Sequence, residues 1–180
     1  AKGVADMMGT SVTAIAVNGG DTAPLGTYGV DKVLNLKDSK LDAFNAAAYA
    51  KGIAAAAKAE GATVVVLSQS ANAKYLAPLL AVELEAGYAS NVVALPESAA
   101  PFKVKRTAFT NKAFNITEIS TDVKIVGLGK NAYGLKENSA AAATEDFSAD
   151  LGTFGVEVAS VDKATDKVSI ADAEIVVSAG

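Results

Sequence analysis

The fold is decided by residues 44–67, which read FNAAAYAKGIAAAAKAEGATVVVL. The alanine-rich part predicts a helix over Phe44–Ala59 that ends at Gly61, because alanine favours helices and glycine commonly terminates them. The following Thr63–Leu67 is apolar without polar alternation, which is typical of a central parallel strand covered on both faces. A strand predicted at Lys32–Leu36 precedes the helix, so the stretch forms a strand–helix–strand unit.

A second helix and strand are expected directly after this unit. Asn72 is a candidate N-cap, although Pro78 favours a regular helix that begins nearer Leu76. Gly87 is the expected stop of this helix. Val92–Leu95 is then predicted to form a short strand, which continues the α/β alternation.

A polar β-hairpin interrupts that alternation. Phe102–Ala108 alternates between two faces, Thr110 and Asn111 supply a turn, and Ala113–Ile119 returns as the partner strand. Polar side chains on both faces predict a sheet edge or an interface for this hairpin. The apolar Val123–Leu128 is expected to rejoin the buried sheet.

The two ends of the sequence indicate a segment of a larger protein. The opening AKGVADMMGTSVTAIAV has the pattern of a helix tail that enters a strand at Val12–Val17, so we expect a first strand to precede it. Late strands are predicted at Gly155–Val161 and Lys167–Val177. Between them and the core of the sequence, the alanine-rich Ser139–Thr144 is either a loose loop or a helical start.

Composition excludes several classes of function. The chain has 180 residues, a net charge of −4 at pH 7, and neither cysteine nor histidine. Disulfides, thiolate or imidazole catalysis and the usual zinc sites are therefore excluded. The mildly acidic balance gives no reason to bind a polyanion, so no nucleic-acid partner is expected. No apolar run approaches the ~20 residues that span a bilayer, so we expect a soluble protein without membrane insertion.

Two motifs are candidate ligand-binding sites. A predicted strand is followed by three glycines, Gly127, Gly129 and Gly134. In a dinucleotide-binding loop the third glycine comes three residues after the second, but here it comes five residues after it. This spacing favours a strand end that turns into a loop. SQSANAK, residues 68–74, follows the apolar strand, and the carboxyl ends of strands are where open α/β sheets bind ligands. The competing interpretation of SQSANAK is the capped start of a helix.

Catalytic residues are not expected. A nucleophilic Ser68 or Ser70 would need a base, and Lys74 is the one candidate nearby. The carboxylates are scattered, and no pair is placed in two distinct environments, as acid–base catalysis requires. We therefore expect no catalytic constellation and no metal site.

Five segments, taken in order, carry a family resemblance: GVDKVLNL (29–36), VVVLSQSANAKYLAPLLAVEL (64–84), KVKRTAFTNKAF (103–114), VKIVGLGKNAY (123–133) and DAEIVVSAG (172–180). Together they resemble the amino-terminal domain of the electron transfer flavoprotein alpha subunit. The departures are Ala73 and Thr110, where that family often has glycine, and Leu79, where it often has arginine.

The resemblance implies a Rossmann-like three-layer α/β sandwich, of the adenine nucleotide alpha hydrolase type, with a mainly parallel sheet and a β-hairpin insertion. It also implies a heterodimeric electron carrier, not an enzyme, that moves electrons from flavin dehydrogenases to an acceptor. Residues 1–172 would form the amino-terminal domain, and residues 173–180 would start the strand that enters the FAD-binding domain. FAD is therefore expected in the parent protein and not on this segment, and the expected location is cytoplasmic.

The segment is expected to act as a scaffold and to dock the beta subunit. Its hairpin carries a polar and aromatic mixture that suits the rim of an interface. We therefore predict that Arg106, Phe109, Asn111 and Lys112 lie at a partner interface. The alternative is a free-standing adenine-nucleotide-binding domain, of the stress-protein or nucleotide-hydrolase type, that uses the SQSANAK turn.

Overall fold

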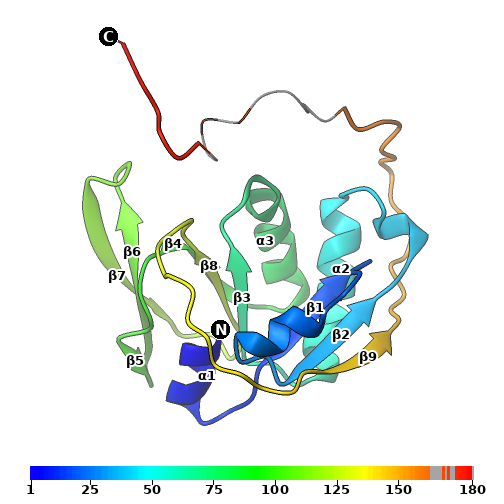
Figure 1. Ribbon diagram of the computed structural model, residues 1–180, viewed down its shortest axis with the longest axis horizontal. Coiled ribbons are helices and arrows are strands. Elements are labelled where there is room, and N and C mark those ends of the chain that lie inside the picture. The colour runs from blue at the N-terminus through cyan, green and yellow to red at the C-terminus, as the bar shows by residue number, and fades with distance from the viewer. Residues whose placement is uncertain (163–167, 169, 171–172, 180) are drawn as a thin grey trace.

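The computed structural model describes residues 1–162, 168, 170 and 173–179, and it is an α/β structure with strands in the middle layer (Figure 1). The elements in chain order are α1 (Lys2–Met8), β1 (Thr13–Val17), η1 (Ala23–Thr27), β2 (Lys32–Leu36), η2 (Ser39–Leu41), α2 (Ala46–Ala59), β3 (Val64–Ser68), α3 (Ala71–Glu83), β4 (Gly87–Val92), β5 (Ser98–Ala99), β6 (Phe102–Ala108), β7 (Ala113–Ile119), β8 (Lys124–Leu128) and β9 (Ala143–Phe147).

The strands form two sheets. The first has three parallel strands in the order β1-β2-β9, and the second has six strands in the order β3-β8-β4-β6-β5, with β7 paired to β6. Strands β3, β8 and β4 run parallel, whereas β6 joins β4, β5 and β7 antiparallel. The mainly parallel sheet with an inserted hairpin is therefore confirmed.

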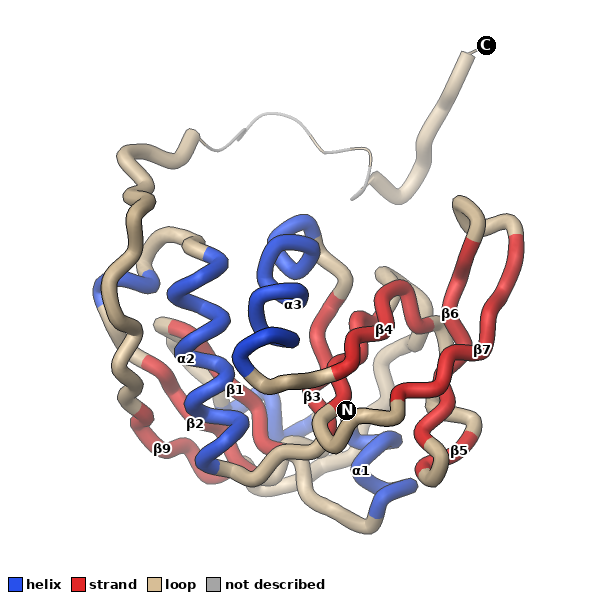
Figure 2. The backbone as a smooth tube through the Cα atoms, turned by 180° about the vertical axis from the view of Figure 1, so that it is seen from behind, coloured by secondary structure: helices blue, strands red, loops and turns tan. Residues whose placement is uncertain are grey.

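Helices cover both faces of the strands, which gives the three layers of a Rossmann-like fold. Figure 2 shows α2 and α3 side by side on one face, where Leu80 and Ile125 lie in a buried cluster together with Val65. On the opposite face, Val4 and Met8 of α1 pack against the second cluster. Successive residues of a strand point to opposite faces, so the alternating valines of β3 contribute to both clusters.

Helix α2 forms as its sequence predicts, with its first residue set by a cap. The side-chain oxygen of Asn45 accepts hydrogen bonds from the backbone N–H groups of Ala47 and Ala48, at 3.0 and 3.2 Å. These bonds satisfy donors that the first helical turn leaves without a partner. At the other end, Gly61 adopts a left-handed φ of 60°, as expected for a glycine stop.

The predicted start of α3 and the predicted position of the next strand were wrong. Ser70, not Asn72, caps α3, because its hydroxyl oxygen accepts from the N–H of Ala73 at 3.2 Å. Pro78 lies inside the helix and is exposed, while the opposite face packs into the core and offsets the lost backbone hydrogen bond. The chain then turns at Glu85 (φ 50°), so β4 spans Gly87–Val92 rather than Val92–Leu95.

The last third of the chain departs furthest from its predicted elements. Ser139–Thr144 was expected to form a loop or a helical start, but β9 begins at Ala143 and pairs parallel with the open edge of β2. Residues 155–161 form no strand and are exposed. Of the strand predicted at Lys167–Val177, residues 167, 169 and 171–172 lie outside the described residues, and the described ones are not in a strand.

Strand β3 does not occupy the central place that its sequence predicts. It is the end strand of the six-stranded sheet, with β8 on one side. Four of its five residues, Val64 to Leu67, are half-buried, although the neighbouring β8 and the equally apolar β2 are largely buried. The apolar sequence of β3 is therefore covered on its two faces but open along one edge.

Candidate functional site

A groove of about 700 Å³ lies at the carboxyl ends of the parallel strands β3, β8 and β4. This is the edge at which open α/β sheets bind ligands. Its walls include three lysines and neither aspartate nor glutamate. The lining residues are Gln69, Lys74, Asn91, Val93, Ala94, Lys105, Thr107, Asn111, Phe114, Gly129, Lys130 and Ala132.

The SQSANAK turn forms one side of this groove. The backbone N–H of Gln69 donates to the carbonyl of Leu128 at 2.8 Å, which joins the ends of β3 and β8. The Ser70 hydroxyl is engaged as the helix cap, so it has a structural role. Lys74, one turn into α3, lines the groove. The turn is therefore both a capped helix start and part of a concave surface.

The glycines after β8 do not form a dinucleotide loop. Gly127 lies inside β8, and a Cβ there would meet the side-chain oxygen of Gln69 and the hydroxyl of Tyr88. Those two groups are hydrogen-bonded to each other, the Tyr88 hydroxyl donating to Gln69 Oε1 at 2.9 Å. No helix follows β8 in the described residues, so a pyrophosphate would find no helix N-terminus here.

The β6–β7 hairpin forms the other side of the groove. Lys105 on β6 places its ammonium 4.4 Å from the centre of the Phe114 ring on β7, which is a cation–π contact between the two strands. Thr107 and Asn111 complete this wall. The structure thus brings together the two motifs that the sequence singled out separately.

The four residues predicted at an interface differ in their exposure and contacts. Arg106 is half-buried and donates to the hydroxyl of Ser90 on β4 at 3.2 Å, while its Nε finds no hydrogen-bond partner among the described residues. Phe109 is 80% exposed at the hairpin tip, where the Lys112 ammonium lies 5.8 Å from its ring. Asn111 is also exposed and lines the groove.

Sequence reasoning missed several residues of this site. Lys105 and Phe114 were assigned to the hairpin but not to a ligand surface, and Asn91 and Lys130 were not singled out. The alternation of the strand does place Lys105 on the same face as Thr107, but it does not show which surface that face lines. The approach of the hairpin to the strand ends depends on the pairing of β6 with β4, which sequence does not reveal.

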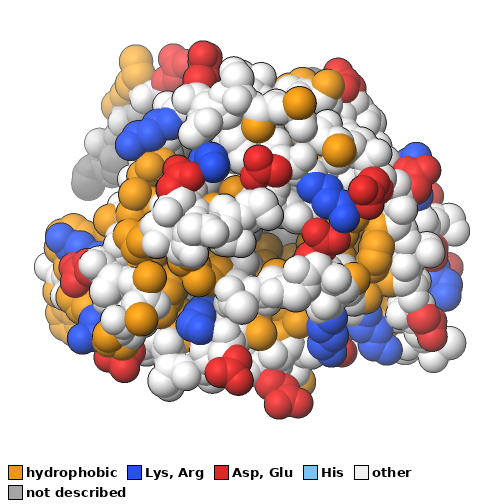
Figure 3. Space-filling view, turned by 90° about the horizontal axis from the view of Figure 1, so that it is seen from below, with side chains coloured by type: hydrophobic (Ala, Val, Ile, Leu, Met, Phe, Trp, Pro, Cys, Tyr) orange, Lys and Arg blue, Asp and Glu red, His pale blue; other side chains and the backbone are white. Residues whose placement is uncertain are grey.

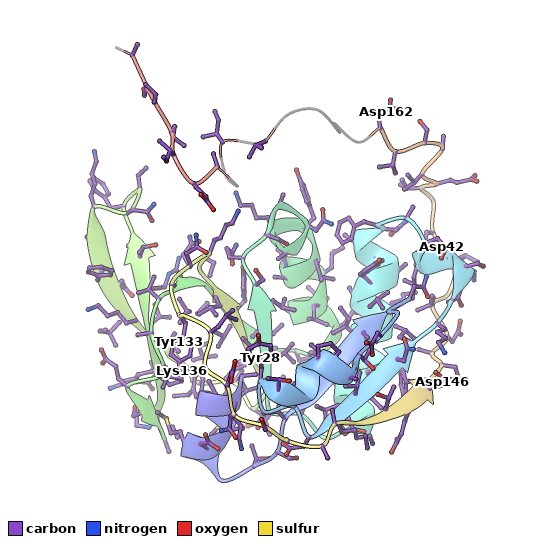
Figure 4. The ribbon with its side chains drawn as sticks, in the orientation of Figure 1. Tyr28, Asp42, Tyr133, Lys136, Asp146 and Asp162 are labelled. Carbon is purple, nitrogen blue, oxygen red and sulfur yellow. The ribbon has the colours of Figure 1, made fainter. Side chains whose placement is uncertain are left out.

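The hairpin also presents large apolar side chains to solvent. Phe109, Phe114 and Ile116 are 80%, 63% and 46% exposed. Basic side chains lie among them, while the labelled Asp42 and Asp146 lie at the opposite edge of the molecule (Figure 4). The hairpin therefore forms an exposed surface that is both apolar and basic, which we call the hairpin surface.

The scattered carboxylates have structural partners. Asp146 lies 2.8 Å from the ammonium of Lys37, and Asp150 accepts from the N–H of Gly152 at 2.9 Å. Hydrogen bonds from Lys32 and Thr13 hold the pKa of Glu60 below its ordinary value, far from the groove. Across the described part of the chain, no group of three or more acidic side chains could hold a metal ion.

No helix in the described part of the chain is long and apolar enough to cross a membrane.

Comparison with known proteins adds two findings. The family model described as the electron transfer flavoprotein domain matches residues 1–151. The chain is also 27% identical, over 163 residues, to the electron transfer flavoprotein subunit alpha of Bacillus subtilis (strain 168). That match covers 85% of this chain and 48% of the relative, so the chain spans about half the length of the curated relative.

Proposed function

The chain belongs to the electron transfer flavoprotein family, and we propose that it forms the amino-terminal domain of an alpha subunit. In this proposal the parent protein pairs with a beta subunit and carries electrons from flavin dehydrogenases to an acceptor. Residues 1–172 are the scaffold, and residues 173–180 lead into the domain that holds FAD. The family match and the similarity to an alpha subunit support the assignment.

The placement of FAD outside this segment is part of the proposal, and one feature of the described residues supports it. They offer no dinucleotide loop, because the space beside Gly127 is filled by Gln69 and Tyr88 and no helix follows β8. When bound to the parent, FAD supplies the redox chemistry. The role proposed for this segment is therefore to hold a partner and a neighbouring domain in place.

The hairpin surface is the observation that carries the docking role. Monomeric proteins seldom gather large exposed apolar side chains on one element unless that element binds something. Aromatic residues are enriched in the centres of protein interfaces, and basic groups at the rim speed association with an acidic partner. Phe109 and Phe114 would insert into the beta subunit, with Asn111 and Lys112 at the rim.

Co-purification with the beta subunit tests the docking role. Replacing both Phe109 and Phe114 with alanine is expected to weaken heterodimer affinity by about 30-fold or more, because truncated aromatic anchors typically cost about 2 kcal/mol or more. The matched control is Tyr75→Ala, which removes a 70% exposed aromatic side chain from α3, away from the hairpin. Equal affinity of the double variant and the control would exclude the hairpin surface as the interface.

A second candidate function is favoured by the groove beside the hairpin. Lys74 and Lys105 line it together with the amides of Asn91 and Asn111, which suits a phosphorylated ligand such as an adenine nucleotide. Titration calorimetry with AMP tests this candidate. We expect the double variant Lys74→Glu/Lys105→Glu to lower AMP affinity by about tenfold or more, since charge-assisted hydrogen bonds contribute about 1.5–3 kcal/mol each. Lys58→Glu, at the end of α2, is the control.

The two candidates predict different results. AMP binding that the lysine variants abolish, without any effect of the hairpin variants on heterodimer formation, would favour a nucleotide-binding domain. Loss of heterodimer in the hairpin variants, with no heat of AMP binding, would favour the docking domain.

A further inference from the structure

Lys105 lies where the groove and the hairpin surface meet. Its side chain lines the groove, and its ammonium lies 4.4 Å from the centre of the Phe114 ring. In the register of the hairpin, Lys105 is directly opposite Ile116, and opposite residues of an antiparallel pair point to the same face. The ammonium therefore belongs both to the groove and to the apolar part of the hairpin surface.

The apolar neighbours of Lys105 are the side chains that a docked partner would bury. Phe114 and Ile116 are both exposed, and Phe114 is one of the aromatic anchors of the docking role proposed above. On the side of the molecule where the hairpin lies, at the left in Figure 3, hydrophobic side chains are interspersed with charged ones. A partner that covers Phe114 and Ile116 therefore also removes the Lys105 ammonium from water.

This face of the hairpin carries more positive than negative charge. Lys103, Lys105 and Glu118 lie on it, and the Lys103 ammonium is 3.6 Å from the Glu118 carboxylate. None of the ion pairs among the described residues includes Lys105, whose ammonium contacts an aromatic ring that attracts a cation but does not neutralise it. Burying an ammonium without a counter-ion costs free energy, so the burial of Lys105 weakens docking unless an anion lies beside it.

The groove provides space and donors for that anion. No aspartate or glutamate is among the described residues that line it, and Lys74 lies on the side formed by the SQSANAK turn. Gln69 also lines the groove, and its side-chain oxygen accepts a hydrogen bond from the Tyr88 hydroxyl at 2.9 Å. The side-chain NH2 of Gln69 is therefore the group that it can offer to a ligand. Gly127 makes room for this arrangement, because a Cβ there would meet both Gln69 and Tyr88.

A phosphate group matches this set of donors. It carries several oxygens that accept hydrogen bonds and more than one unit of negative charge, and lysines bind it as point charges. The groove, at about 700 Å³, accommodates either inorganic phosphate or the phosphate of a nucleotide. Two lysines and an amide therefore recognise the phosphate group itself, whichever molecule carries it.

We propose that a phosphate group bound in the groove, beside Lys74 and Lys105, strengthens docking of the beta subunit on the hairpin surface. This inference rests on the docking role proposed above. The bound phosphate neutralises Lys105 as Phe114 and Ile116 are buried, so the heterodimer forms without an unpaired ammonium in its interface. Because the coupling between two binding sites is reciprocal, the docked subunit strengthens phosphate binding by the same factor.

The affinity of the heterodimer, measured with and without inorganic phosphate, tests the proposal. Titration calorimetry of the parent alpha subunit with the beta subunit is carried out at one ionic strength, adjusted with sodium chloride, because salt alone screens exposed charges. Phosphate is expected to strengthen the heterodimer by about fivefold or more, which is the lower range of coupling between two sites. AMP is expected to act as phosphate does. An equal effect of adenosine, which lacks the phosphate, would overturn the phosphate group as the ligand.

Lys105→Met separates this site from any other phosphate site. Methionine keeps an apolar side chain beside Phe114 and removes the charge. The variant is expected to lose the phosphate effect and to bind the beta subunit without phosphate about as tightly as the unchanged protein does with it. Lys112→Met is the matched control, because Lys112 lies 5.8 Å from the Phe109 ring on the same hairpin but does not line the groove. In this control the ratio of affinities with and without phosphate is expected to stay unchanged.

Equal affinity of the unchanged protein with and without phosphate would overturn the proposal, and so would a phosphate effect that survives in Lys105→Met. Lower affinity of Lys105→Met in both buffers would also overturn it, because a carboxylate of the partner, rather than phosphate, would then neutralise this lysine. The docking role itself fails on a separate result, which is unchanged affinity of the Phe109→Ala/Phe114→Ala variant. If that variant weakens the heterodimer while phosphate has no effect, the docking role stands and only the phosphate coupling fails.

Discussion

Thr110 at the tip of the hairpin adopts a backbone conformation that threonine disfavours. Phe109, Thr110 and Asn111 all adopt left-handed conformations, with φ of 53°, 53° and 61°. Asparagine tolerates this region, but a β-branched side chain such as that of threonine rarely does. The resembled family often has glycine at this place, which would fit without strain. The hairpin therefore closes because β6 and β7 pair over seven residues, despite the strain at its tip.

Replacing Thr110 with glycine is expected to stabilise the chain. Relief of the left-handed strain, at about 1–2 kcal/mol, exceeds the entropic cost of glycine, at about 0.5–1 kcal/mol. A gain of about 1 kcal/mol corresponds to a rise of about 2–4 °C in melting temperature for a chain of this size. Differential scanning calorimetry measures this shift.

The control is Thr117→Gly, which places glycine inside β7, where it should destabilise by up to about 1 kcal/mol. A fall in melting temperature for both variants would show that the tip is not held in the left-handed region.

At the scale of elements, the junction of α2 with the first sheet depends on Glu60. Its carboxylate accepts from Lys32 Nζ on β2 and from the Thr13 hydroxyl on β1, both at 2.9 Å. Lys32 also lies 3.1 Å from Glu145 on β9. One lysine therefore links a helix end to the outer strand of the sheet, and the hydrogen bonds that it donates to Glu60 and Glu145 raise the pKa of that lysine.

This junction predicts a loss of stability in acid. The pKa of Glu60 is held below its ordinary value of 4.5, first by the hydrogen bond from Lys32 and then by that from Thr13. A depressed carboxyl pKa contributes stability that is complete above pH 4.5 and is lost as the pH falls through the folded-state value. The contribution is expected to stay below about 1 kcal/mol, because the site is exposed to solvent.

Urea unfolding between pH 3 and pH 7 measures the effect. Glu60→Gln should lower stability at pH 7 and reduce its dependence on pH below about 4.5. Glu157→Gln, on the exposed segment after β9, is the control and should leave the dependence unchanged. An unaltered acid dependence in Glu60→Gln would exclude this junction as a contributor.

Helices and strands with a clear residue pattern could be predicted from the sequence, whereas a strand that forms only beside a partner strand could not. Helix α2 and strands β2 and β8 follow their alanine or valine patterns, and the hairpin follows its alternation. Strand β9 was missed because ATEDF has no apolar periodicity, and it forms only where the open edge of β2 accepts it. The start of α3 was misplaced because Asn72 and Ser70 are both good caps, and the hydrogen bond to Ala73 favours Ser70.

At the scale of the whole molecule, the groove and the hairpin surface are neighbours. The groove and the hairpin surface share Phe114, so a docked partner and a bound anion would influence each other.

The candidate site itself was only half predictable from the sequence. SQSANAK follows a strand, and strand ends are the usual ligand positions in such sheets, so this side of the groove could be predicted from the sequence. The opposite wall did not follow, because Lys105 and Phe114 reach the strand ends only through the pairing of β6 with β4 at Val92 and Arg106. The sequence also did not show that Arg106 donates a hydrogen bond to Ser90 while Phe109 is exposed to solvent.

The sequence by itself determined the class of fold, the main helices and strands, and the family resemblance that the domain match confirms. These properties depend on local periodicity and on motifs, which the order of residues contains directly. The tertiary structure alone decided which strands are neighbours, that β3 has an open edge, and that two distant motifs share one groove. Such pairings depend on contacts between residues far apart in the chain. Many arrangements of the strands satisfy the same local pattern, and the folded chain selects the one in which the backbone N–H and C=O groups find partners.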